Sequence, residues 1–69
     1  MGRVMGTVKF FDSEKKYGII IGDDDKKYLF MQRDILRKNK HVKAKDRVLF
    51  GTVKDARGTR AVEVRVVGN

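Results

Sequence analysis

Alternating apolar and polar positions run through most of this chain and predict β-strands rather than helices. Residues 4–11 are rich in Val and Phe, and residues 17–21 join an aromatic residue, a glycine and three isoleucines. Residues 26–32 form a third apolar segment, and residues 47–54 and 59–67 alternate strictly. Polar or glycine-containing turns separate these segments, which is typical of a meander or a small barrel.

The number and length of these segments predict the fold class. Five strands, no convincing long helix and 69 residues fit an all-β fold, namely a five-stranded antiparallel barrel of the OB type. A chain of this length is expected to fold as a single domain over residues 1–69. An SH3-like barrel of similar size is the alternative. Strict alternation in the last segment places Ala61 on the face opposite to Val64, and Phe50 is expected in the core.

One segment departs from the strand pattern, because residues 33–47 are strongly basic. They hold seven Lys or Arg residues and two Asp residues, a net charge of +5. Residues 33–37 are expected to form one short helical turn. The remainder is expected to be a long mobile loop, since few apolar residues anchor it, and some of its cations are expected to contact nucleic acid.

The whole chain is basic as well, which narrows the class of partner. It carries 17 Lys or Arg and 9 Asp or Glu, a net charge of +8. Such a charge on so short a chain favours nucleic acids, because binding releases condensed counterions. A membrane surface is the rival polyanion, but the sequence contains no basic amphipathic helix with bulky apolar anchors.

Several kinds of chemistry are disfavoured by what the chain lacks. It has no cysteine, which excludes disulfides and thiolate metal sites, and its one histidine, His41, cannot build a metal site alone. Asp12, Glu14 and His41 are not spaced as an acid–base set, so no catalytic residue and no cofactor are expected. The three aspartates at residues 23–25 lack the spacing of a calcium loop and predict a solvated turn. The longest purely apolar run, residues 19–21, is too short for a membrane span, so we expect a cytoplasmic protein, as a monomer or a dimer.

The most specific signal lies in residues 6–20, which read Gly-Thr-Val-Lys-Phe-Phe-Asp-Ser-Glu-Lys-Lys-Tyr-Gly-Ile-Ile. This segment resembles the opening of cold-shock domains, whose pattern is G-x-V-K-W-F-N-x-x-K-G-F/Y-G-F-I. The directly matching positions are Gly6, Val8, Lys9, Phe11, Lys15, Tyr17, Gly18 and Ile20. The differing positions are Phe10 for the Trp, Asp12 for the Asn, Lys16 for the Gly and Ile19 for the second Phe. The resemblance continues more weakly through residues 47–50 and 58–66, which look like the fourth and fifth strands.

The resemblance implies a surface that binds single-stranded RNA or single-stranded DNA. The contact residues that it implies are Lys9, Phe10, Phe11, Lys15, Tyr17, Ile19, Phe30, Gln32 and Arg33. Among them, Phe10, Tyr17 and Phe30 are implied to form a platform on which bases stack, with Phe11 at the edge of this platform. Lys9 and Lys15 are implied to contact phosphates. Stacking on an aromatic side chain contributes about 1–3 kcal/mol per base and tolerates any base, whereas a duplex hides its base faces.

Strict alternation conflicts with the resemblance at one place in the first strand. Alternation puts Phe10 on the same face as Val8, which the family places in the core. We therefore expect a β-bulge or a local twist near Lys9 and Phe10, and this expectation comes from the resemblance.

The third strand is where the match fails, and two registers are open there. The family carries V-F-V-H-F, whereas residues 29–33 read Leu-Phe-Met-Gln-Arg. In the first register Phe30 and Gln32 face the ligand, while the leucine and the methionine face the core. In the second register every side chain is on the opposite face, so that Leu29 and Met31 face the ligand. We favour the first register, because it buries Leu and Met and exposes Gln.

The predicted function is that of an RNA chaperone or a regulator of transcription or translation. Weak, rapid binding would prevent misfolded RNA structures without ATP, and the sequence has no phosphate-binding P-loop motif. The platform has fewer rings than the family uses, although Arg33 can stack through its guanidinium plane. We therefore expect the affinity to depend more on salt than in a typical relative. The alternative is a basic OB-type module that docks on structured RNA or on a ribosome or protein partner.

Overall fold

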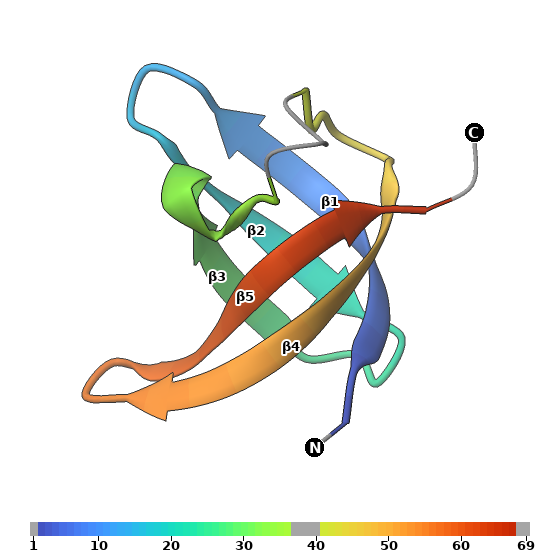
Figure 1. Ribbon diagram of the computed structural model, residues 1–69, viewed down its shortest axis with the longest axis vertical. Coiled ribbons are helices and arrows are strands. Elements are labelled where there is room, and N and C mark those ends of the chain that lie inside the picture. Colours follow the sequence, from blue (N-terminus) through green and yellow to red (C-terminus); the bar gives the residue numbers. More distant parts are fainter. Residues whose placement is uncertain (1, 37–40, 68–69) are drawn as a thin grey trace.

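Five β-strands close into a barrel in the computed structural model, which describes residues 2–36 and 41–67 (Figure 1). The strands are β1 (Val4–Asp12), β2 (Tyr17–Gly22), β3 (Lys27–Met31), β4 (Arg47–Asp55) and β5 (Gly58–Val66). Their order around the barrel is β1-β2-β3-β5-β4, and β4 pairs with β1 to complete the circle. The predicted all-β, five-stranded barrel is confirmed. One contact, between β3 and β5, is parallel rather than antiparallel.

Side chains from all five strands and from one loop fill the barrel. The buried hydrophobic residues are Val8, Ile20, Tyr28, Phe30, Val42, Val48, Phe50, Ala61 and Val64. Phe50 is fully buried, as predicted, and its ring centroid lies 5.0 Å from that of Tyr28. Because a chain of this size can bury only a modest core, the aromatic rings account for a large share of its apolar burial.

A β-bulge in β1 decides which aromatic side chain reaches the surface. Val8 pairs with Ile20, and the next pair along the two strands is Phe10 with Ile19, so Lys9 is an extra residue in β1. The extra residue reverses the alternation, with the result that Val8 is buried and Phe10 is exposed. The irregularity expected near Lys9 and Phe10 is thereby confirmed.

A second irregularity lies between β4 and β5. The pairing shifts by one residue between Leu49 and Gly51, and on the opposite strand Glu63 has a φ of 52°, in the left-handed region. Ala61 and Val64 are both fully buried, although strict alternation puts them on opposite faces. The prediction of their faces was wrong, because one extra residue in a strand moves every later side chain to the other face.

The basic segment between β3 and β4 begins with a short 3-10 helix, η1 (Gln32–Asp34), earlier and shorter than the helical turn expected over residues 33–37. Val42 is buried in the core, so the expected lack of an apolar anchor is wrong for residues 41–46. The backbone N–H of Lys45 also donates to the carbonyl oxygen of Val8 at 2.8 Å. The remaining part of the loop prediction, residues 37–40 with their cations, lies outside the described residues.

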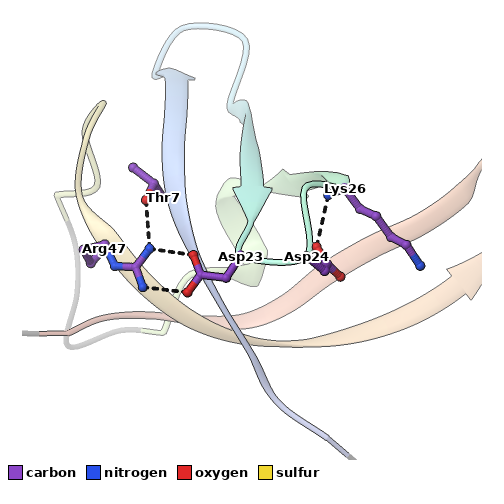
Figure 2. A network of polar contacts seen from close by, with 5 residues as sticks. All are labelled: Thr7, Asp23, Asp24, Lys26 and Arg47. Carbon is purple, nitrogen blue, oxygen red and sulfur yellow. Dashed lines mark hydrogen bonds and ion pairs between the residues drawn. The ribbon is translucent and has the colours of Figure 1, made fainter.

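Polar contacts hold the turn between β2 and β3 against β4 (Figure 2). Arg47 donates from Nη1 and Nη2 to the two carboxylate oxygens of Asp23, both at 2.8 Å, and Nη1 also donates to Thr7 Oγ1 at 3.0 Å. The Arg47 hydrogen bonds hold the pKa of Asp23 below its ordinary value of 3.8. Asp24 Oδ1 accepts from the backbone N–H of Lys26 at 3.1 Å. These aspartates are exposed residues that shape a turn, as the sequence predicted.

Candidate nucleic-acid interface

The outward faces of β1, β2 and β3 form one continuous surface. Paired residues of antiparallel strands point to the same side of the sheet, so the register defines rows of neighbouring side chains. The first row joins Phe10, Ile19 and Leu29, and the second joins Asp12, Tyr17 and Met31. We name the five aromatic and apolar side chains of these rows the outer platform: Phe10, Tyr17, Ile19, Leu29 and Met31.

Two aromatic rings form the part of the outer platform that can stack on bases. Phe10 is 37% exposed, the result of the bulge in β1, and Tyr17 is half-buried. Their ring centroids are 5.7 Å apart and their planes are at 86°. The remaining members are aliphatic or a thioether, so they offer apolar contact without an aromatic face.

Phe30 lies inside the barrel rather than on the outer platform. Its exposed fraction is 0%, and its ring stacks on that of Phe11 with centroids 5.6 Å apart and planes at 18°. It pairs with Gly18 of β2, and a Cβ on Gly18 would lie 2.8 Å from the Phe30 ring. The missing side chain of Gly18 thus makes room for the ring in the core. The prediction that Phe30 stacks on bases was wrong.

β3 therefore adopts the second of the two registers. Tyr28 and Phe30 face the core, whereas Leu29 and Met31 lie on the outside. Two aromatic rings bury more apolar surface than Leu and Met, and the Tyr28 hydroxyl donates to Asp24 Oδ2 at 2.6 Å, which satisfies its polar end. The same hydrogen bond lowers the pKa of Asp24. The first register was favoured because it buries Leu and Met and exposes Gln32. It was wrong because the burial of two aromatic rings contributes more.

The other predicted contact residues are distributed around the outer platform. Lys9 is exposed at the bulge, and Lys15 is exposed in the turn between β1 and β2. Gln32 and Arg33 are exposed in η1, directly after the last residue of β3. Phe11 is half-buried and packs against the core, so it does not lie at the platform edge as expected.

Cations without carboxylate partners surround the outer platform. In the part of the chain that the structure describes, exposed cations outside every ion pair on this side are Lys9, Lys15, Lys16, Lys27 and Arg33. The cations in ion pairs are Arg3, Lys43, Arg47 and Arg60. The unpaired set can neutralise phosphates without first breaking a contact of the protein.

A groove of about 370 Å³ lies between Leu29 and Met31 of the outer platform and the turn between β4 and β5, the long hairpin at the lower left of Figure 1. Its principal lining residues are Leu29, Met31, Arg33, Asp55, Arg57 and Arg60. The favoured register put the first two in the core, and no contact role was predicted for the last three. The run Asp-Ala-Arg-Gly-Thr-Arg at residues 55–60 places two arginines beside a tight turn, a signal that could have identified them.

A family of known proteins matches nearly the whole chain. The family described as the 'Cold-shock' DNA-binding domain matches residues 4–67. The chain belongs to this family, a class of nucleic-acid-binding proteins rather than enzymes. In the part of the chain that the structure describes, no helix is long and apolar enough to cross a membrane.

Individual relatives extend over nearly the whole chain. The cold shock-like protein of Aquifex aeolicus is 38% identical over 65 residues, which are 91% of this chain and 93% of that protein. The major cold shock protein of Micrococcus luteus is 36% identical over 62 residues, which are 87% of this chain and 92% of that protein. The solved structure of drosophila Unr CSD456 superposes with a TM-score of 0.81 at 15% identity, covering 97% of this chain and 27% of that one. This superposition confirms the OB-type fold.

Proposed function

We propose that this protein binds single-stranded RNA, and also single-stranded DNA, by stacking bases on the outer platform. The observation that carries the proposal is the position of Phe10. The bulge at Lys9 turns this ring out of the barrel, where it is 37% exposed beside Tyr17. An exposed apolar surface bordered by unpaired cations is complementary to unpaired bases joined by phosphates.

The proposed binding divides between rings and charges. Phe10 and Tyr17 stack on bases at about 1–3 kcal/mol each, without regard to base identity. The unpaired cations around them, such as Lys9 and Lys15, contact phosphates and release counterions. With Phe30 inside the barrel, two of the three rings predicted to stack, Phe10 and Tyr17, remain on the outer platform. A large share of the affinity is therefore electrostatic.

Such binding supports a role as an RNA chaperone. A shallow surface that accepts any unpaired base would hold strands open and prevent stable misfolded structures, without ATP. Regulation of transcription or translation follows from the same binding when the strand is a nascent or messenger RNA. The proposal includes a monomeric state, because one chain provides both the rings and the cations. It also includes a cytoplasmic location, where messenger RNA is available for binding.

The direct test is fluorescence anisotropy with labelled oligo-U, oligo-dT and a duplex of the same length. We expect both single strands to bind more tightly than the duplex, whose base faces are hidden. Tighter binding to the duplex would overturn the proposal.

Matched variants test the role of Phe10. Phe10→Ala should weaken oligo-U binding by about 5-fold or more, which corresponds to about 1 kcal/mol of lost stacking. Val53→Ala is the control for loss of exposed apolar surface without loss of a ring. Val53 is 39% exposed on β4 and pairs with Arg60 of β5, so it lies two strands beyond Leu29, and its substitution should change the affinity much less than Phe10→Ala. Equal effects of the two substitutions would show that the ring has no specific role.

The second candidate function is docking on structured RNA or on a ribosome or protein partner through the basic segment. The burial of Phe30 favours it, because two rings give a weaker stacking surface than three. Phe10→Ala and Tyr17→Ala discriminate between the candidates. If both leave RNA affinity unchanged while neutral substitutions in residues 33–47 abolish it, docking is the correct function.

A further inference from the structure

The groove beside the β4–β5 turn combines an apolar floor with charged walls. Leu29 and Met31 contribute the apolar part, and Arg33, Asp55 and Arg57 contribute charged side chains of both signs. Its volume of about 370 Å³ can accommodate a single purine base. A site with an acceptor and donors around an apolar floor can recognise a base by its hydrogen-bonding edge as well as by its flat face.

The groove is continuous with the outer platform, because Leu29 belongs to both. On one side Leu29 pairs with Ile19 of β2, and on the other it pairs with Arg60 of β5. Neighbouring strands lie about 5 Å apart, so a nucleic acid bound over Phe10 and Ile19 reaches the groove with an adjacent nucleotide. This continuity favours a base of the same bound strand as the occupant.

Asp55 has acceptor capacity that the protein leaves unused. Its Oδ1 accepts from the backbone N–H of Arg57 at 2.9 Å, which fixes the carboxylate in the turn. Its Oδ2 lies 3.9 Å from Arg60 Nε, too far for a hydrogen bond, and the side chain is 47% exposed. Within residues 2–36 and 41–67, no other donor reaches Oδ2, so this oxygen can accept from a ligand.

The arginines of the groove fall into two kinds. Arg60 is fixed, since its Nη1 lies 3.4 Å from Asp34 Oδ2, which also accepts from the backbone N–H of Met31 at 2.9 Å. Arg33 and Arg57 are exposed, and no carboxylate of the described residues forms an ion pair with either. Their guanidinium groups are therefore available to the acceptor atoms of a base.

We propose that this groove is a base-selective subsite that prefers guanine over uracil within a bound single strand, an inference that rests on the proposed function. Guanine presents two adjacent donors, N1–H and the N2 amino group, to the Asp55 carboxylate. Its O6 and N7 accept from a guanidinium such as that of Arg57. Uracil offers one N–H between two carbonyl oxygens, which the carboxylate repels. Adenine and cytosine fall between, because each places a ring-nitrogen acceptor beside its single amino group.

The test compares two short RNAs of equal length by fluorescence anisotropy at one salt concentration. One is all uridine, and the other carries a single central guanosine, which avoids the self-association of guanine runs. Good base-edge contacts discriminate by about 10-fold, so the guanosine strand should bind about 10-fold more tightly. The amide resonances of Ala56 and Arg57 should shift more with the guanosine strand than with the uridine strand.

Two variants with the same change of charge test whether the preference for guanine depends on Asp55. Asp55→Asn retains an oxygen for the Arg57 N–H but loses the carboxylate, so the preference should fall to about 2-fold or less. Asp25→Asn is the control, because Asp25 is exposed in the turn between β2 and β3 and its φ of 66° is tolerated by Asn. This variant should keep the full preference for guanine.

Each contrary outcome has a distinct meaning. Equal affinity of the native protein for the two strands overturns the guanine subsite but leaves the proposed function standing, since the uridine strand still binds. A preference that survives Asp55→Asn, or amide shifts at Ala56 and Arg57 that are the same for both strands, also overturns the subsite. Failure of both strands to bind overturns the proposed function itself.

Discussion

A methyl group added at Gly18 should destabilise the barrel, because β2 has no room for it. A Cβ on Gly18 would lie 2.8 Å from the Phe30 ring and closer still to the carbonyl oxygen of Phe10. The Phe30 ring is fully buried and cannot swing outward, and the Phe10 oxygen belongs to the backbone of the bulge. Gly18→Ala should therefore force β2 away from both neighbouring strands.

The magnitude follows from two opposing contributions. Overpacking a core costs about 1–3 kcal/mol, and one obstacle here is backbone, which argues for the upper half of that range. Replacing Gly by Ala in a strand raises the free energy of unfolding by roughly 0.5–1 kcal/mol, because it lowers the conformational entropy of the unfolded chain. We expect a net loss of about 2 kcal/mol, which is a large fraction of the roughly 3–5 kcal/mol that a core of this size supplies.

Urea denaturation followed by circular dichroism measures this loss, with Gly51→Ala as the matched control. A Cβ on Gly51 would meet Val62 Cγ2 at 3.6 Å, which is ordinary van der Waals contact. Gly51→Ala should therefore change the free energy of unfolding by less than about 0.5 kcal/mol, or raise it slightly. The two variants carry the same chemical change in two strands of one barrel, β2 and β4, so their difference isolates the clash.

Equal unfolding midpoints for Gly18→Ala and the native protein would refute the packing of Phe30 against Gly18, and with it the register of β3. The double variant with Phe30→Leu tests the cause. Since loss of the ring relieves one of the two close contacts, the double variant should lose less stability than the sum of the single variants.

Three further predictions concern binding and acid stability. Ile19→Phe adds a third ring beside Phe10 and should tighten oligo-U binding by about 5- to 100-fold in anisotropy titrations, whereas unchanged affinity would argue against stacking there. If the five unpaired cations contact phosphates, the slope of log affinity against log salt concentration should be about −3 to −4. A slope near zero would show that phosphate contacts contribute almost nothing to the affinity. Because Arg47 lowers the pKa of Asp23 below 3.8, the stability that this pair contributes is complete above that pH and is lost as the pH falls through the lowered value. Asp23→Asn should flatten the acid-induced fall of the urea midpoint relative to Asp25→Asn, and equal acid dependence of the two variants would contradict the role of the pair.

Much of the fold could be predicted because strand formation depends on local alternation. The positions of the five strands and the burial of Phe50 follow from it. The outward turn of Phe10 does not, since periodicity alone keeps it on the face of Val8. The resemblance to cold-shock domains gave the bulge, because a bulge is an inserted residue that no periodicity contains.

The face of β3 could not be predicted because it depends on particular side-chain contacts that the alternation of the strand does not contain. Both registers of residues 29–33 place apolar side chains in the core, and the alternation is equally regular in each. The register depends on Gly18, which has no Cβ and so leaves room for the Phe30 ring in the core. It also depends on Asp24, whose carboxylate accepts a hydrogen bond from the Tyr28 hydroxyl. For this reason the candidate site has Leu29 and Met31 on the outer platform in place of the predicted Phe30 ring.

The distribution of charge connects the fold with the proposed selectivity. Arg47 is bound to Asp23 in the β2–β3 turn, and Arg60 of β5 is bound to Asp34 in η1, so both arginines serve the fold rather than the ligand. The cations that remain around the outer platform attract any phosphate backbone, and Phe10 with Tyr17 stacks on any base. Neither contribution distinguishes one base from another. A carboxylate does distinguish them, because it attracts donor edges and repels carbonyl edges, and Asp55 is a carboxylate in the groove that adjoins the platform. Sequence selectivity in this protein should therefore depend on an acidic residue, although its overall affinity depends on basic ones.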